Sequence, residues 1–306
     1  MTKVFIDGSA GTTGLRIHER LAARKDLQIL TLSDELRKDS TARAEMLKTA
    51  DIAFLCLPDA AAIEAVELAK GSAVRIIDTS TAHRTNPAWV YGFAELSRRD
   101  EIANARLVAN PGCHASGFLA LVTPLVKAGL LSSDAALVAF SITGYSGGGK
   151  KMIADYESDG RDALLGAPRQ YGLTQAHKHL PEMCAVSGLS TLPCFSPIVA
   201  DFYSGMEVTV PLFAKDLRGS VEDVKALYAA TYNTPVVHYE SEAGEGGFLS
   251  AAALSGRDDM EISVAGNADR IMLTARYDNL GKGASGAAIQ NMNIMLGVDE
   301  TLGLSL

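Results

Sequence analysis

The sequence contains few cysteines. There are four among 306 residues, namely Cys56, Cys113, Cys184 and Cys194. No two of them are separated by two residues, and disulfide-stabilised secreted domains carry many more cysteines for their length. We therefore expect reduced thiols in a cytoplasmic protein, in which one cysteine can be catalytic.

Long hydrophobic runs and an excess of positive charge are also missing. No unbroken apolar run is longer than that at residues 52–57, whereas a bilayer requires about 20 residues. The opening residues, MTKVFIDG, reach an acid after three apolar residues, which does not fit a signal peptide. Lys and Arg number 28 against 36 Asp and Glu, a formal charge of −8. We expect neither membrane nor nucleic acid as a partner, and an acidic substrate needs a locally basic pocket.

The remaining composition is that of a globular protein. Hydrophobic residues make up 47% of the chain and charged residues 21%, so a large core can form without disulfides. The length favours about two domains.

Short apolar runs alternate with helical segments over the first hundred residues. The runs are residues 4–6, 29–32, 52–57 and 74–77. Strands that are apolar throughout and are separated by helices are typical of a parallel sheet covered on both faces. The pattern predicts an α/β fold with an N-terminal doubly wound, Rossmann-type parallel sheet.

After residue 112 the pattern changes. A helical stretch covers about 114–128, a strand about 137–143, and strands of antiparallel character lie at 206–213, 262–265 and 271–277. We expect an α+β catalytic domain with a mixed or antiparallel sheet over residues 113–280. The dinucleotide-binding domain comprises residues 1–112 together with 281–306, whose helix, at about 284–296, returns to it.

A glycine-rich turn, GSAGTTG at 8–14, joins the first strand to the first helix. Glycines permit positive φ and allow backbone N–H groups to approach a phosphate at the helix N-terminus. The spacing G-x-x-G-x-x-G is only moderately specific, and a tight turn without ligand is the alternative. The predicted phosphate-binding residues are Gly8, Gly11, Thr12, Thr13 and Gly14.

The end of the second strand, expected near Ser33, bears on cofactor choice. Asp34 suits a ribose hydroxyl, whereas Ser33, Arg37 and Lys38 suit a 2′-phosphate. The residues alone leave this choice open, and a solvated charged face is a third interpretation.

Cys113 follows a chain break at Asn110-Pro111-Gly112, and helical periodicity begins just after it. A thiol at a helix N-terminus is stabilised as the thiolate by the helix dipole and the free N–H groups. Cys113 is therefore the candidate nucleophile, and the same N–H groups can hold an oxyanion. A small buried hydrophobic residue is the alternative interpretation.

Two further segments carry candidate site residues. The cluster HKHLPE at 177–182 offers His177 and His179 as acid/base partners of a thiolate, or as half of a zinc site with no recognisable third ligand. The stretch at 144–150 reads as a glycine-rich loop and nearly matches a P-loop, but Lys151 replaces the Ser or Thr that binds Mg²⁺. We expect this loop to bind a phosphate or carboxylate through Ser146, Gly147, Gly148 and Lys150.

Taken together, these motifs resemble the N-acetyl-γ-glutamyl-phosphate reductases, in their shorter subgroup, within the aspartate-semialdehyde-dehydrogenase-like superfamily. The matching segments run nearly from end to end: GSAGTTG at 8–14, DTSTAHR at 78–84, NPGC at 110–113, GYSGGG at 144–149, HKHLPE at 177–182 and NLGKGASGA at 279–287.

The resemblance implies roles residue by residue. Cys113 corresponds to the nucleophile and His177 to the acid/base residue, with Tyr171 and His179 as weaker candidates near the reacting centre. It implies NADP(H) as cofactor, with Ser33, Arg37, Ser80 and Asn279 as contacts, and Arg84 as a substrate contact. Lys150 stands where arginine is common and His114 where tyrosine is common, which affects the details of carboxylate binding. A homodimer or homotetramer and no bound metal are also expected.

The resulting hypothesis is a reduction of N-acetyl-γ-glutamyl phosphate by NADPH in arginine biosynthesis, with phosphate released and a thioester formed on Cys113. The nearest alternative is an aspartate-semialdehyde-dehydrogenase-type reduction of another acyl phosphate. A non-catalytic dinucleotide sensor and a zinc-binding structural protein are more distant alternatives.

Overall fold

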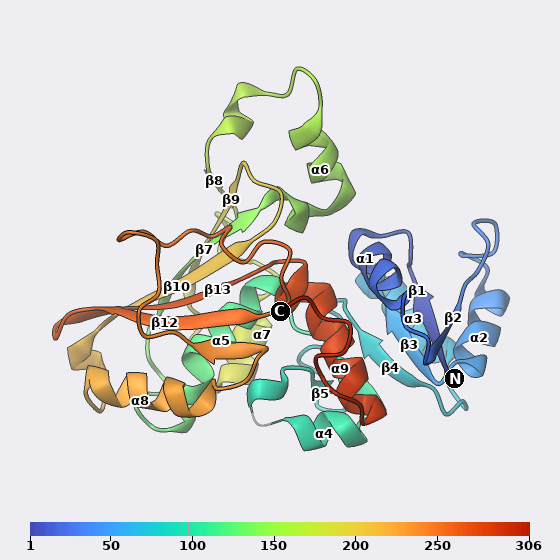
Figure 1. Cartoon of the computed structure of the whole chain (residues 1–306), viewed down its shortest axis with the longest axis horizontal. Coiled ribbons are helices and arrows are strands. Elements are labelled where there is room, and N and C mark those ends of the chain that lie inside the picture. Colours follow the sequence, from blue (N-terminus) through green and yellow to red (C-terminus); the bar gives the residue numbers. More distant parts are fainter. Residues whose placement is uncertain (97) are drawn as a thin grey trace. The chain divides into compact units, whose positions relative to one another are not determined.

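The computed structural model describes residues 1–96 and 98–306, which form two compact units (Figure 1). Unit 1 comprises Met1–Gly112 and Ala284–Leu304, and unit 2 comprises Cys113–Gly283 with Ser305–Leu306. In the part of the chain that the structure describes, no helix is both long and apolar enough to cross a bilayer.

Unit 1 is built on a six-stranded sheet in the order β2-β1-β3-β4-β6-β5, and every neighbouring pair is parallel. The all-parallel sheet confirms the doubly wound α/β prediction for this part of the chain. Its strands are β1 (Thr2–Asp7), β2 (Leu27–Leu30), β3 (Ile52–Leu55), β4 (Arg75–Asp78), β5 (Val90–Tyr91) and β6 (Leu107–Ala109).

Helices cover both faces of this sheet because successive strand residues point to opposite sides. Val4 and Ile6 of β1 join one core, while Phe5 joins the other. The first core contains residues of α1 (Thr12–Leu21), α4 (Arg99–Asn104) and α9 (Gly286–Leu296). The second contains residues of α2 (Ser40–Thr49) and α3 (Asp59–Leu68).

Unit 2 has a seven-stranded sheet in the order β11-β12-β13-β10-β7-β9-β8. Strand pairs β7/β9 and β11/β12 are parallel and the others are antiparallel, which confirms the predicted mixed sheet. The strands are β7 (Val138–Gly144), β8 (Arg169–Gln170), β9 (Cys194–Ala200), β10 (Met206–Phe213), β11 (Val237–Tyr239), β12 (Met260–Gly266) and β13 (Arg270–Tyr277).

The helices of unit 2 are α5 (Cys113–Lys127), α6 (Gly149–Glu157), α7 (Leu180–Ser187) and α8 (Val221–Thr231). Helix α5 packs against β10 and β13 and contacts α7 and α8. It is apolar nearly all round, as expected of a buried helix. Helix α6 and the segment after it extend beyond the end of the sheet near β8 and β9 (Figure 1).

Two tyrosines satisfy carbonyl groups inside α5. Pro124 has no N–H, so the carbonyl of Ala120 lacks its helical donor. The hydroxyl of Tyr232 donates to that carbonyl at 2.5 Å, and the hydroxyl of Tyr228 donates to the carbonyl of Leu121 at 2.5 Å. The buried helix therefore tolerates its internal proline.

The other face of the sheet exposes large apolar side chains. Val138, Phe140, Phe213 and Met272 are 38–54% exposed, and they alternate with buried neighbours along their strands. A contiguous exposed patch of this kind is typical of an interaction surface.

Two predicted element boundaries were wrong. The second strand ends at Leu30 rather than near Ser33. Residues 144–150 form no open loop, because a 3₁₀ turn over Tyr145–Gly148 runs directly into α6. A short π-helical turn, Gly281–Ser285, likewise precedes α9.

Candidate active site

The glycine turn of unit 1 requires its glycines. Gly8 has φ of 88°, and a Cβ there would lie 2.3 Å from the carbonyl oxygen of Cys56. A Cβ at Gly14 would lie 2.4 Å from the carbonyl oxygen of Gly8. Helix α1 begins at Thr12, and no side chain of the described residues caps its N-terminus. The turn thus has the close backbone and the uncapped N–H groups that fit a dinucleotide phosphate.

A buried ion pair lies next to this turn. The guanidinium of Arg43 donates to the carboxylate of Asp7 at 2.9 and 3.0 Å and to Glu64 at 2.9 Å. Burial raises the pKa of Asp7, and Arg43 opposes that rise. The pair joins the end of β1 to α2 and α3, so it supports the glycine turn from within unit 1. Local sequence patterns do not reveal this pair, because its residues are far apart along the chain.

The three candidate cofactor-choice residues lie in the segment after β2. Ser33, Asp34 and Arg37 are all exposed, and the Arg37 guanidinium lies 3.4 Å from the Asp34 carboxylate. An exposed pair of this kind contributes little free energy, so Arg37 remains able to turn toward another anion.

The segment after β4 is held by its own buried polar groups. Asp78 accepts hydrogen bonds from the backbone and hydroxyl of Ser80 at 2.9 and 2.8 Å, and its carboxylate lies 2.6 Å from Nδ1 of His83. Arg84 donates to the carbonyls of Asn110 and Thr79 at 3.0 and 2.9 Å. Ser80 and Arg84 therefore organise this segment, and their predicted ligand contacts stay predictions.

Cys113 is the first residue of α5 and is half-buried. The hydroxyl of Tyr277 donates to its carbonyl oxygen at 2.6 Å, and a Cβ at Gly283 would lie 3.1 Å from its Cβ. Burial, and then negative charge at Cys113, raise the pKa of Tyr171. The thiol therefore shares its surroundings with the phenol of Tyr171.

Aromatic rings cluster in the same unit. The His114 and His177 ring centroids lie 5.4 Å apart, His177 and His179 lie 4.8 Å apart, and Phe195 of β9 packs 5.2 Å from His177. The structure thus brings together Tyr171, His177 and His179, which the sequence analysis singled out.

His114 and Ser141 complete this cluster, and the sequence analysis gave neither a role. Nδ1 of His114 lies 2.7 Å from the Ser141 hydroxyl, and Nε2 lies 2.6 Å from the Tyr171 hydroxyl. Burial, and then the charges of His177 and Lys178, lower the pKa of His114 to about 3. A neutral imidazole therefore links Ser141 to Tyr171. The position of His114 directly after Cys113 was the available signal.

Nδ1 of His177 has a defined hydrogen-bond donor. Its Nδ1 accepts the backbone N–H of His179 at 3.2 Å, so we assign the proton of the neutral ring to Nε2. Burial, and then the charge of Lys178, lower the pKa of His177. The arrangement favours a neutral ring that donates through Nε2–H.

The segment carrying His177 is fastened to β9 by Gln175. Its side-chain amide donates to the carbonyl of Phe195 at 2.8 Å and accepts the N–H of Phe195 at 2.9 Å. Gln175 also has φ of 55°, the one positive value among the described non-glycine residues. This backbone conformation is unfavourable for glutamine, so the paired amide bonds must offset its cost.

The segment at 144–150 differs from the anion-binding loop expected. The N–H groups of Gly144, Tyr145 and Ser146 donate to carbonyls of residues 205, 202 and 203 at 2.9–3.0 Å. These three donors are therefore used within unit 2. Gly147, Gly148 and Lys150 are exposed or nearly so, and their contribution to substrate binding stays a prediction.

Asn279 holds this segment in place. Its Nδ2 donates to the Ser146 hydroxyl at 3.0 Å, and its Oδ1 accepts the N–H of Gly205 at 2.9 Å. Both residues are buried. Their side chains thus have structural partners, and the predicted contacts of Asn279 with cofactor and Ser146 with substrate stay predictions.

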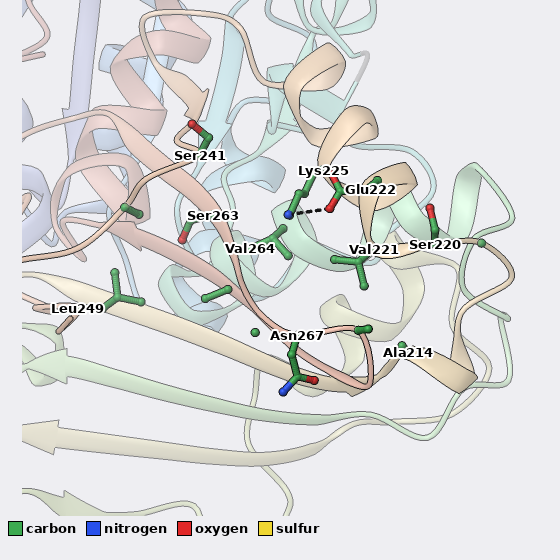
Figure 2. Close-up of a pocket in the computed structure, with 15 residues that line it drawn as sticks. Ala214, Ser220, Val221, Glu222, Lys225, Ser241, Leu249, Ser263, Val264 and Asn267 are labelled. Atoms are coloured by element: carbon green, nitrogen blue, oxygen red, sulfur yellow. Dashed lines mark hydrogen bonds and ion pairs between the residues drawn. The ribbon is translucent and has the colours of Figure 1, made fainter.

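Figure 2 shows a different hollow of unit 2, of about 690 Å³, beside the N-terminus of α8 and the β12–β13 turn. Among the described residues no cysteine or histidine lines it, and its Lys225 and Glu222 pair at 2.8 Å. This hollow therefore lacks the thiol and imidazole groups that the candidate active site brings together. Across residues 1–96 and 98–306, no three metal-binding side chains are grouped as a site.

Comparison with known proteins identifies related chains. The model of the semialdehyde dehydrogenase dimerisation domain matches residues 113–279, and that of the semialdehyde dehydrogenase NAD binding domain matches residues 34–105. The chain is 48% identical to N-acetyl-gamma-glutamyl-phosphate reductase of Brucella ovis, over 96% of this chain and 99% of that protein. It is 45% identical to N-acetyl-gamma-glutamyl-phosphate reductase 2 of Nostoc sp., over 99% of each.

Solved structures with a similar fold include aspartate semialdehyde dehydrogenase II of Vibrio cholerae in complex with ASA. It has a TM-score of 0.73 and 17% identity, with 97% of this chain and 98% of that chain covered. Aspartate semialdehyde dehydrogenase of Francisella tularensis has a TM-score of 0.72 and 16% identity, with 97% and 100% covered. At these identities the likeness concerns the fold alone.

Proposed function

The chain belongs to the N-acetyl-gamma-glutamyl-phosphate reductases of the semialdehyde dehydrogenase family, and from this premise we propose how its residues perform the reaction. The protein is an oxidoreductase that reduces N-acetyl-γ-glutamyl phosphate to N-acetyl-glutamate semialdehyde with release of phosphate, in arginine biosynthesis. The proposal concerns the thioester on Cys113, the roles of the neighbouring residues, the cofactor and the assembly.

Cys113 performs the acyl transfer. Its thiolate attacks the acyl carbon, a carbon–sulfur bond forms, and the carbon–oxygen bond to phosphate breaks as inorganic phosphate leaves with the electron pair. The position at the N-terminus of α5 supports this role, because the helix dipole there stabilises a thiolate.

The neighbouring histidine stabilises the charge that develops on the bound acyl group. When bound, a reduced nicotinamide supplies the hydride that the thioester carbonyl accepts. His177 donates Nε2–H to the oxygen of the tetrahedral carbon, and collapse then breaks the carbon–sulfur bond and returns the thiolate. Tyr171, held by the neutral His114, is a second hydrogen-bond donor for this oxygen.

Unit 1 holds the dinucleotide. The glycine turn binds its phosphates through the N–H groups of Thr12, Thr13 and Gly14, since Gly8 and Gly14 have no space for a side chain. We propose NADP(H) as the physiological cofactor, with Ser33 and Arg37 binding the 2′-phosphate. Arg37→Ala should raise KM for NADPH at least tenfold while leaving KM for NADH within twofold. Equal effects on both cofactors would contradict this assignment.

The surface of unit 2 and the state of the cysteines bear on the assembly and on the cellular compartment. The unit 2 sheet has an exposed apolar face that includes Phe140 and Met272. This face supports a homo-oligomer, either a dimer or a tetramer. A reducing compartment keeps a catalytic thiolate reduced, and none of the four cysteines forms a disulfide in the structure, so we propose a cytoplasmic enzyme.

The observation that carries the proposed mechanism is the clustering of Tyr171, His114 and His177 in the unit that presents Cys113 at the start of a helix. The test is a coupled absorbance assay of N-acetyl-glutamate semialdehyde, phosphate and NADP⁺. Cys113→Ser should remove nearly all turnover while leaving NADPH binding intact, and Cys194→Ser serves as the control. A fully active Cys113→Ser enzyme would exclude the thioester. A preference for aspartate semialdehyde over N-acetyl-glutamate semialdehyde would contradict the assignment of the substrate.

A further inference from the structure

The hydroxyl of Tyr277 makes two hydrogen bonds with the first turn of α5. It donates to the carbonyl oxygen of Cys113 at 2.6 Å and accepts the backbone N–H of Gly117 at 3.0 Å. Residues 113 and 117 are the two ends of that turn. One side chain of β13 therefore grips the turn that presents the thiol, from both of its ends.

Glycine at position 117 leaves the space that this contact needs. A Cβ at Gly117 would lie 2.7 Å from the Tyr277 hydroxyl and 2.7 Å from Cγ2 of Val208, so only glycine lets the phenol approach the helix. Tyr277 is fully buried, and burial raises its pKa well above the ordinary value. The hydroxyl thus keeps the proton that it donates to Cys113.

A second contact limits movement of the nucleophile. A Cβ at Gly283 would lie 3.1 Å from Cβ of Cys113 and 3.4 Å from Cε2 of Tyr277. Backbone at residue 283 therefore packs against both the cysteine and the tyrosine ring. The carbonyl that Tyr277 holds is bonded to the Cα that carries the thiol side chain, so a shift of that carbonyl moves the sulfur.

We propose that Tyr277 is a positioning residue for the reaction at Cys113, with its hydroxyl fixing the first turn of α5 to β13 and thereby the place of the attacking sulfur. This inference rests on the proposed function of Cys113. Misplacement of a reacting group by about 1 Å can cost about a hundredfold in rate. Tyr277 therefore acts through the backbone of the nucleophile and touches no reacting atom.

The same helix offers a matched control. Tyr232 also donates its hydroxyl to a carbonyl of α5, that of Ala120, and is also buried. Each of the two variants removes one buried hydroxyl that bonds to α5. Tyr277→Phe acts at the first turn of the helix, and Tyr232→Phe acts near its middle. Loss of helix stability alone affects both variants, whereas loss of positioning affects only Tyr277→Phe.

The experiment measures kcat, KM and the pH profile of Cys113 alkylation by iodoacetamide, with alkylated peptides resolved by mass spectrometry. For Tyr277→Phe we expect kcat to fall by about ten- to a hundredfold with KM for semialdehyde within threefold, and the Cys113 alkylation rate to change at least fivefold. Exposed Cys194 in the same sample is the internal standard. Tyr232→Phe should keep kcat and Cys113 alkylation within twofold.

Unchanged kcat and alkylation in folded Tyr277→Phe would overturn the proposal, as would equal losses in both variants. If Tyr277→Phe does not fold, Gly283→Ala decides. Its new methyl group would lie 3.1 Å from Cβ of Cys113 and 3.1 Å from the carbonyl oxygen of Asp278, while the hydroxyl of Tyr277 remains. Loss of at least fivefold in its Cys113 alkylation rate supports tight positioning, and an unchanged rate contradicts it. Alkylation of Cys113 needs no substrate, so this test does not depend on turnover. An active Cys113→Ser enzyme would exclude the thioester in a separate experiment.

Discussion

Among the individual residues, the proposed chemistry depends on neutral imidazoles and on groups held by the backbone. The sequence singled out Cys113 and His177 by type and local context, and Tyr171 by family resemblance. It could not show that His114 links Ser141 to Tyr171, because those three residues come from α5, β7 and the segment after β8. Nor could it show the proton position on His177, which depends on one backbone N–H.

The buried His114 predicts a pH dependence of stability. Its pKa is about 3 in the folded chain and about 6.5 in the unfolded chain, so the unfolded state binds the additional proton between these values. The free energy of unfolding should therefore fall as pH decreases from about 6.5 toward 3, by about 1.4 kcal/mol per pH unit from this residue. Urea unfolding at several pH values should show a shallower slope for His114→Asn. Parallel slopes for both proteins would contradict a neutral His114.

His177 and His179 should differ in their effect on turnover. If Nε2–H of His177 stabilises the developing oxyanion, His177→Ala should lower kcat about a hundredfold with KM for phosphate within threefold. His179→Gln, which leaves the backbone N–H that His177 accepts, should lower kcat less than fivefold. Steady-state kinetics of both variants make the comparison, and the reverse order of effects would transfer the role to His179.

At the scale of the element, apolar periodicity predicted most strands and helices within a few residues, since burial determines both. The segment at 144–150 was missed because its N–H groups bond to carbonyls of residues 202–205, which are distant in sequence. The hydrogen bond between the side chains of Ser146 and Asn279 is also a long-range contact that local composition does not reveal. Local composition identifies chain breakers, whereas long-range hydrogen bonds decide what a glycine-rich segment becomes.

The two hydrogen bonds of the Gln175 side chain predict that the segment carrying His177 can be destabilised without changing an aromatic residue. Gln175→Ala removes two hydrogen bonds to Phe195 and keeps the unfavourable φ, so unfolding free energy should drop by about 1–2 kcal/mol. We also expect kcat to fall at least fivefold, because His177 loses its fixed place. Gln170→Ala is the matched control, since Gln170 also bonds to β9 but only weakly, at 3.3 Å to Ser196. Urea unfolding and steady-state kinetics should leave Gln170→Ala close to wild type.

For the whole molecule, the composition gives an acidic chain. The structure divides it into two units, one built on a parallel sheet and one on a mixed sheet. The sequence predicted both sheets but not which face of the second stays open, because strand register and helix placement decide that. Phe140, Phe213 and Met272 on that face are more exposed than an isolated chain in water favours.

The open face predicts how the assembly can be broken. Phe140→Glu combined with Met272→Glu places charges on this apolar face and should convert the oligomer to smaller species, since unpaired charges are costly to bury. Light scattering after gel filtration measures the molar mass. Leu164→Glu, at an exposed apolar residue of the 3₁₀ turn Ala163–Gly166, is the control and should keep the wild-type mass. An unchanged mass for the double variant would place the interface elsewhere.

The thioester on Cys113 can be trapped by mixing enzyme, N-acetyl-glutamate semialdehyde and NADP⁺ without phosphate. We expect a rapid burst of about one NADPH per active chain and then a stall, because the acyl group stays on Cys113 until phosphate accepts it. Mass spectrometry of the quenched enzyme should find the acyl group on the peptide that contains Cys113, and added phosphate should restart turnover. Steady NADPH formation without phosphate and without any adduct on that peptide would contradict the account.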